Sequence, residues 1–166
     1  MDDNLNQANQ AETPMPLTLK PEEQELLREE VAAFAAAAPS AEARAEYAGL
    51  LALIESGELP DAALEPLGQV LEVGLQTGRI RKIHRAVGEQ TLLRLFHKTP
   101  AGAAHTQGIN DLNAALAQLQ GQAIESVRVL GRVPGTYLLM ISTDDIELTL
   151  RFSPDEAAVE SVAVGV

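Results

Sequence analysis

Six cationic side chains and two histidines gather in the middle of this sequence, within residues 79–98. The candidate binding residues among them are Arg79, Arg81, Lys82, His84, Arg85, Arg94 and Lys98. Guanidinium and ammonium groups at this density bind carboxylates or phosphates. Three interpretations are open: neutralisation of the protein's own acidic helices, docking of an acidic protein or other anionic partner, and binding of nucleic acid.

The surroundings of this basic segment argue against nucleic acid. Surfaces that bind single strands place aromatic rings among the cations for base stacking, and Phe96 is the one aromatic residue of the segment. The chain as a whole carries a formal net charge of −12, which repels polyanions at long range. We therefore expect a protein partner or an anionic ligand at residues 79–98.

The other groups that could do chemistry are dispersed. His84, His97 and His105 are 13 and 8 residues apart, so no two of them share a helix face at the spacing that metal ligands use. The sequence has no cysteine, no serine in a G-x-S-x-G turn and no glycine-rich phosphate loop. We predict no catalytic residue, no metal site and no cofactor.

Composition favours a small cytoplasmic protein. With 166 residues the chain suits one domain. Its N-terminus is acidic and polar, unlike a signal peptide, and no run of about 18 apolar residues marks a spanning helix. We expect residues 1–17, which are rich in Asn, Gln and Pro, to be a disordered tail.

Apolar spacing predicts helices over most of residues 18–120. The first should begin at Pro21, and the second should follow the N-cap residue Ser40 and end at Gly57. Further helices are expected from Pro66 to Gly78, over about 89–97, and from about Asn110 to Gln120. Residues 79–87 are ambiguous between helix and extended chain.

After Gly121 the apolar period changes from 3.6 to 2. Four runs, 123–130, 136–142, 146–152 and 158–165, are separated by turn residues, which predicts an antiparallel meander. In the third run Leu148 and Leu150 should face the core and Thr149 the opposite side. The second run is apolar on both faces, which indicates a homodimer that buries one of them.

The stretch from Ile109 to Val164 resembles the second half of the NTF2-like cone folds. There a helix leads into a strand and a curved antiparallel meander, as in INDLNAALAQLQGQAIESVRVL, GTYLLMIS, IELTLRF and VESVAV. The resemblance implies a pocket between sheet and helices and dimerisation through the outer face of the sheet. That family includes enzymes and non-enzymes.

These observations predict an α+β fold of one domain, residues 18–166. A mainly helical part (18–120) would pack on a four-stranded antiparallel meander (121–166). The function we expect is that of a non-enzymatic interaction or regulatory protein with a basic docking segment at 79–98. The alternatives are a small-molecule binding domain with a pocket between sheet and helices, and an unrecognised enzyme.

Overall fold

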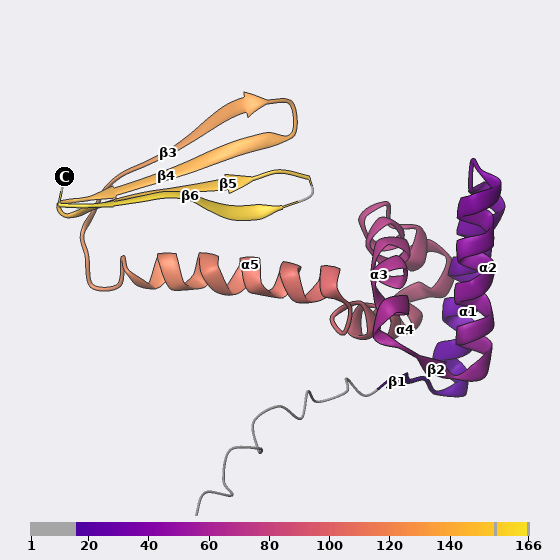
Figure 1. Ribbon diagram of the computed structural model, residues 1–166. Coiled ribbons are helices and arrows are strands. Elements are labelled where there is room, and N and C mark those ends of the chain that lie inside the picture. Colours follow the sequence, from indigo (N-terminus) through magenta and orange to yellow (C-terminus); the bar gives the residue numbers. More distant parts are fainter. Residues whose placement is uncertain (1–15, 155, 166) are drawn as a thin grey trace, which may run out of the picture. The chain divides into compact units, whose positions relative to one another are not determined.

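The computed structural model describes residues 16–154 and 156–165, and the chain divides into two compact units after Ala101. The helical unit holds α1 to α4, and the sheet unit holds most of α5 and a four-stranded sheet (Figure 1). The helices are α1 (Pro21–Ala37), α2 (Ala41–Ser56), α3 (Asp61–Gln76), α4 (Arg79–Phe96) and α5 (Pro100–Ala117). The strands are β1 (Leu17–Thr18), β2 (Glu58–Leu59), β3 (Ile124–Val133), β4 (Thr136–Thr143), β5 (Ile146–Phe152) and β6 (Ala157–Val164).

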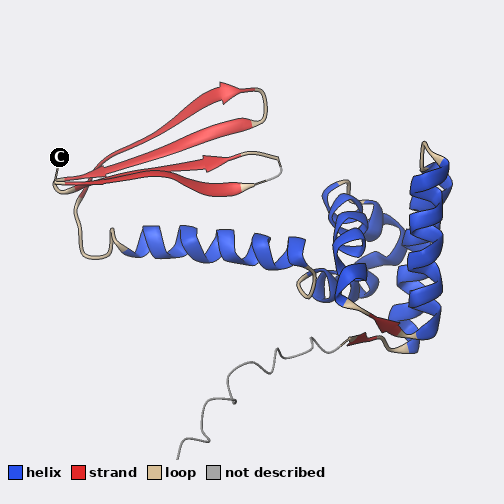
Figure 2. Ribbon diagram, in the orientation of Figure 1, coloured by secondary structure: helices blue, strands red, loops and turns tan. Residues whose placement is uncertain are grey.

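The α+β layout is confirmed, with the helices first and the large sheet last (Figure 2). Most of the predicted tail lies outside the described residues, although Leu17 pairs with Leu59 in the small sheet β1–β2. No described helix has both the length and the apolar character needed to cross a membrane.

Local signals position α1 and α2 where the sequence predicts them. Pro21 occupies the first turn of α1, and the backbone N–H of Lys20 donates to the Glu23 carboxylate at 2.9 Å. The Ser40 hydroxyl accepts from the Ala43 N–H at 3.1 Å, and Gly57 ends α2 with a φ of 81°. These contacts satisfy backbone groups that helix ends leave unpaired.

Two predicted helix starts are wrong. The third helix begins at Asp61 instead of Pro66, because burial of Ala63 and Leu67 holds the first turns although Pro66 cannot donate a backbone hydrogen bond. The fifth begins at Pro100, where its alanine-rich first turns outweigh two glycines. The ambiguous residues 79–87 are part of α4.

The core of the helical unit is aliphatic. Its fully buried side chains come from all four helices and β2: Leu27, Val31, Ile54, Leu59, Leu67, Leu71, Ile80 and Leu92. Two glycines of α3 permit close packing, since a Cβ on Gly68 would lie 2.9 Å from the Thr99 hydroxyl and one on Gly74 would lie 2.8 Å from Ile80. Larger residues at either position would force the helices apart.

The sheet has the predicted order β3-β4-β5-β6, with every pair antiparallel. Leu148 and Leu150 face inward as predicted and form a buried cluster with Leu112 and Ala115 of α5. Thr149 lies on the opposite face and is nevertheless only 7% exposed. That face is therefore more closed than the alternation alone indicates.

One carboxyl pair makes the stability of the sheet unit sensitive to pH. A hydrogen bond with Asp144, together with the negative charge of Asp144, raises the pKa of Glu125 above its ordinary value. A carboxyl whose pKa is raised by folding favours the folded state at low pH, and this contribution is lost as the pH rises through the raised pKa.

Glu125→Gln should therefore raise the Tm, relative to wild type, more at about pH 7 than at about pH 3.5, below the ordinary Glu pKa. Thermal unfolding followed by circular dichroism at both pH values measures the difference. Glu46→Gln, which removes an equal charge from the surface of α2, is the control for net charge. A Tm difference that is the same at both pH values would contradict the coupling.

Candidate functional site

The basic segment occupies α4 and the two residues after it. Gly78 begins the helix with a φ of 69°, and its carbonyl accepts from the Lys82 N–H at 3.1 Å. The helix consists of two segments separated at Arg85, whose backbone is not helical (φ 58°, ψ −166°). The first segment carries Arg79 to His84 and the second carries Arg94.

A buried glutamate of α1 holds the first of these segments. Glu30 is fully buried, and Arg79 Nε donates to its Oε2 at 3.1 Å. His84 Nε2 lies 2.8 Å from Glu30 Oε1, and the histidine side chain is only 4% exposed. We call these three residues the Glu30 cluster. A buried carboxylate is costly unless it is paired and hydrogen-bonded, and here both oxygens have partners.

Two further cations of the segment also face acids of the same chain. Arg94 lies 3.6 Å from Glu23, a second buried carboxylate of α1, and Arg81 lies 3.8 Å from Glu89. Internal neutralisation therefore accounts for Arg79, His84 and Arg94. The Arg81 contact is long, and its side chain remains 75% exposed.

The remaining cations lie on the surface. In the part of the chain that the structure describes, Lys82, Arg85 and Lys98 have no ion pair within 4 Å. The same stretch of sequence exposes two large apolar side chains, Ile83 at 39% and Val87 at 79% exposure. We call Arg81, Lys82, Ile83, Arg85 and Val87 the docking strip.

The backbone of Arg85 is strained. Its φ and ψ lie in a region that is populated almost exclusively by glycine, and no other non-glycine residue among 16–154 and 156–165 has a positive φ. The neighbours explain why the chain turns here. His84 is held by Glu30 on one side, and on the other Gly88 packs so closely that a Cβ on it would lie 2.3 Å from the His84 Cβ.

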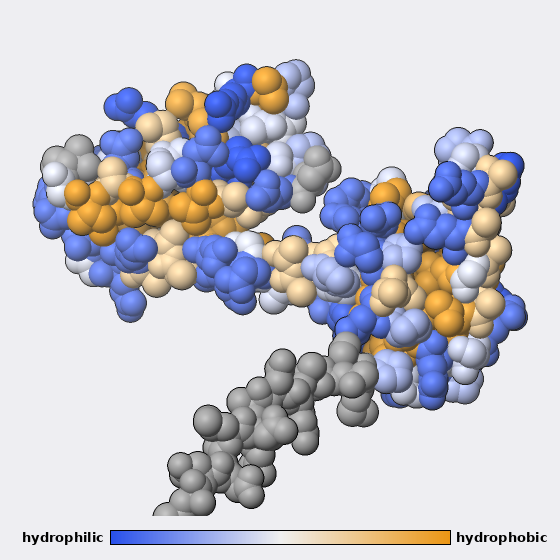
Figure 3. All heavy atoms as spheres, viewed as in Figure 1, coloured by the Kyte–Doolittle hydropathy of each residue, from blue (hydrophilic) through white to orange (hydrophobic). Residues whose placement is uncertain are grey.

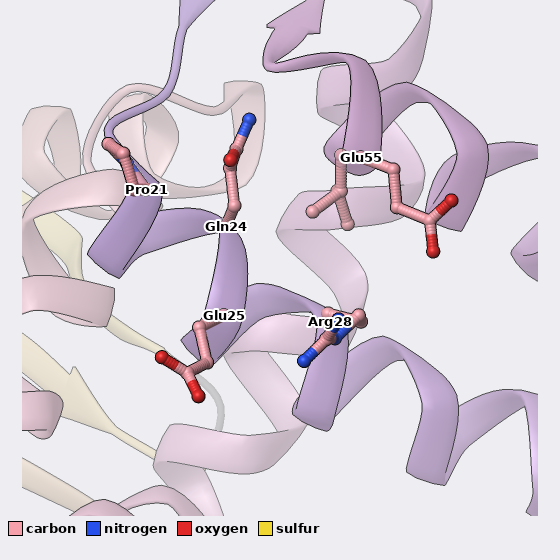
Figure 4. A pocket seen from close by; sticks show the side chains of 6 residues that line it. Pro21, Gln24, Glu25, Arg28 and Glu55 are labelled. Carbon is pink, nitrogen blue, oxygen red and sulfur yellow. The ribbon is translucent and has the colours of Figure 1, made fainter.

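A separate pocket of about 280 Å³ lies between α1 and α2 (Figure 4). Buried Ile54 forms its apolar part, while Gln24, Arg28 and Glu55 are among the polar residues that line it. The small-molecule alternative predicted a pocket between sheet and helices, whereas this one lies within the helical unit. Among the described residues no three His, Asp or Glu side chains are placed to hold a metal ion.

Comparisons with protein families, with curated proteins and with solved structures found no match to this chain. The resemblance to NTF2-like folds therefore rests on element order and apolar period.

Arg79 and Lys82 should respond very differently to the same substitution. Arg79→Met leaves the buried charge of Glu30 with His84 as its one remaining partner, which should lower the free energy of unfolding by about 3 kcal/mol. Lys82→Met changes an exposed residue without an ion pair in the described chain, and should change stability by less than about 0.5 kcal/mol. Urea unfolding measures both values. Equal losses would show that Lys82 also has a structural role.

Arg85→Gly should not destabilise the protein, although glycine within a helix ordinarily does. Relief of a strained backbone is worth about 1–3 kcal/mol, whereas glycine costs about 0.5–1 kcal/mol relative to Ala. The control Ala86→Gly, one residue further along, has no strain to relieve and should lose about that smaller amount. A variant Arg85→Gly that is less stable than Ala86→Gly would refute the assigned strain.

Proposed function

We propose that this chain is a non-enzymatic interaction protein whose docking strip binds an acidic segment of another protein. The observation that carries the proposal is the division of the basic segment into two groups. Arg79, His84 and Arg94 face buried acids, while Lys82 and Arg85 are exposed without an ion pair among the described residues. Internal neutralisation accounts for the first group and leaves the second unexplained.

The chemistry of the strip defines the partner. Exposed charge pairs contribute only about 0–1 kcal/mol each, so cations alone do not give affinity. Ile83 and Val87 add apolar surface that a partner can cover, worth roughly 25 cal/mol per Å². The complementary ligand is therefore a peptide segment in which acidic and apolar side chains lie on one face.

The same features favour protein over nucleic acid. The docking strip contains no aromatic side chain for base stacking, and Phe96 is only 6% exposed within the core. The net charge of −12 opposes long-range attraction of a highly charged polyanion. A peptide with a few carboxylates meets less of this repulsion and gains from the apolar contacts.

Small-molecule binding is the second candidate, and the pocket between α1 and α2 favours it. Arg28 and the carboxylates of Glu25 and Glu55 surround the pocket, and none of the three has an ion pair within the described residues. A ligand with charges of both signs would match this lining. At about 280 Å³ the pocket lies just below the usual range of about 300–1,000 Å³ for ligand sites. We therefore rank it second.

A defined peptide tests the docking strip. A fluorescent synthetic helix-forming peptide with Glu and Leu on one face should bind the wild-type chain, as measured by fluorescence anisotropy. Lys82→Gln combined with Arg85→Gln should weaken binding roughly tenfold, which corresponds to about 1.4 kcal/mol. Salt should weaken the remaining charge contacts as well.

The matched control is Arg44→Gln combined with Arg128→Gln. It removes two exposed arginines outside the strip, so both double variants have the same net charge. The control should bind the peptide within about twofold of wild type, a difference of roughly 0.4 kcal/mol. Equal weakening by both double variants would mean that net charge alone governs binding, and the proposed docking strip would be rejected.

A further inference from the structure

The edge strand β3 of the sheet unit is open to pairing. It lies at one end of the order β3-β4-β5-β6 and pairs with β4 alone. Nine of its ten residues are exposed. Long edge strands expose unpaired backbone N–H and C=O groups that pair readily with another strand, and proteins usually protect them with charges, bulges or short length. β3 is long, and Figure 1 shows it at the border of the sheet.

The side chains of β3 are unusually apolar for an exposed edge. Five large hydrophobic residues are 49–64% exposed: Ile124, Val127, Val129, Leu130 and Val133. Register shifts near both ends of the strand leave residues 126–131 as a regular central segment. Figure 3 shows that apolar side chains also gather elsewhere on the sheet unit, so exposure alone does not choose the edge.

The opposite edge is less suited to pairing. The register of β6 shifts in its middle, between its partners Thr149 and Leu150. Its Glu160 pairs with Arg151 of β5 at 3.0 Å and with Arg132 of β3 at 3.1 Å. A bulge twists an edge out of line, and a charged residue discourages a second strand. In β3 the register shifts and Arg132 lie outside the central segment 126–131, where Arg128 is the one charged residue.

We propose that a second copy of this chain pairs with β3 through its own β3, antiparallel, with Val129 on the two-fold axis. Residues directly opposite in an antiparallel pair lie on the same face. Val127 and Val129 lie on the α5 side, opposite Ile141 and Leu139 of β4. In the proposed register Val129 meets Val129 of the second copy, and their neighbours on that face are Val127 and Gly131.

Charge selects this register over its nearest alternative. Shifting the axis to Arg128 would place the two Arg128 side chains directly opposite each other, and like charges in that position are destabilising. With Val129 on the axis, Arg128 lies opposite Leu130 of the second copy, which the apolar stem of the arginine can cover. The strand is thus self-complementary, and this favours a second copy over an unrelated strand.

Pairing through β3 is independent of the proposed function, because it uses residues of the sheet unit and the docking strip lies in the helical unit. Salt should affect the dimer and peptide binding in opposite directions. Residues 102–166 contain eight acids and three bases, so two copies of the sheet unit repel each other and added salt should strengthen the dimer. One strand pair is smaller than a standard interface, so the dimer should form at concentrations on the order of tens of micromolar.

Cysteine crosslinking tests the register directly, since the chain has no cysteine of its own. Ser126, Val127, Arg128, Val129 and Leu130 are each replaced by Cys in the full chain and oxidised under equal conditions. A residue on the axis faces its own copy within disulfide range, about 4.4–6.8 Å between Cα atoms. Val129→Cys should give the highest yield of covalent dimer. A maximum at another position, or no crosslink along β3, would overturn the proposal.

Sedimentation velocity provides the second measurement. Wild type should sediment as a concentration-dependent dimer, and Val129→Lys should be monomeric with an unchanged circular dichroism spectrum. Val164→Lys, at a 72% exposed valine of the other edge strand, should dimerise like wild type. A monomeric wild type, or equal loss of the dimer in both lysine variants, would rule out β3 pairing and leave that edge for a strand of another protein.

Discussion

The burial of Glu30 is the constraint on which the arrangement of the basic segment depends. A fully buried carboxylate must be paired, and its two oxygens take Arg79 and His84 from α4. Because Arg79 and His84 both contact Glu30, the first segment of α4 is tied to α1 at two points. Arg81 and Lys82, between the two partners, are then left facing outward. The exposed cations are thus a consequence of the buried acid.

Local signals in the sequence predicted much of the fold, and tertiary effects account for the errors. The N-cap Ser40, the C-cap Gly57 and the alternation of the strands act on neighbouring residues. Such local signals can be recognised in the sequence without knowledge of the tertiary structure. The start of α3 depends on burial of Ala63 and Leu67 against other helices, which outweighs the contrary signal of Pro66. Internal neutralisation was one interpretation of Arg79, but its specific partner was not predicted, although Glu30 lies three residues after Leu27 on the apolar stripe of α1. An acid on such a stripe indicates a buried ion pair.

The two units present different chemistry for contacts with other chains. The helical unit exposes cations beside apolar side chains, on a protein that is otherwise strongly acidic. The sheet unit instead exposes a long, regular and largely apolar edge. Contacts of the first kind are screened by salt, whereas strand pairing between two acidic units is strengthened by it. The two proposals thus assign self-association and partner binding to separate surfaces of one chain.

The strain at Arg85 raises the question of why an arginine occupies this position of the docking strip. The turn between His84 and Gly88 needs a backbone conformation that glycine adopts without cost, and an arginine there costs about 1–3 kcal/mol. No contact of the Arg85 side chain within the described structure offsets this strain, since the side chain is exposed and forms no ion pair there. A costly residue that does nothing for its own fold is best explained by a contact outside it. The strain at Arg85 therefore supports the proposed docking strip independently of the unpaired charges.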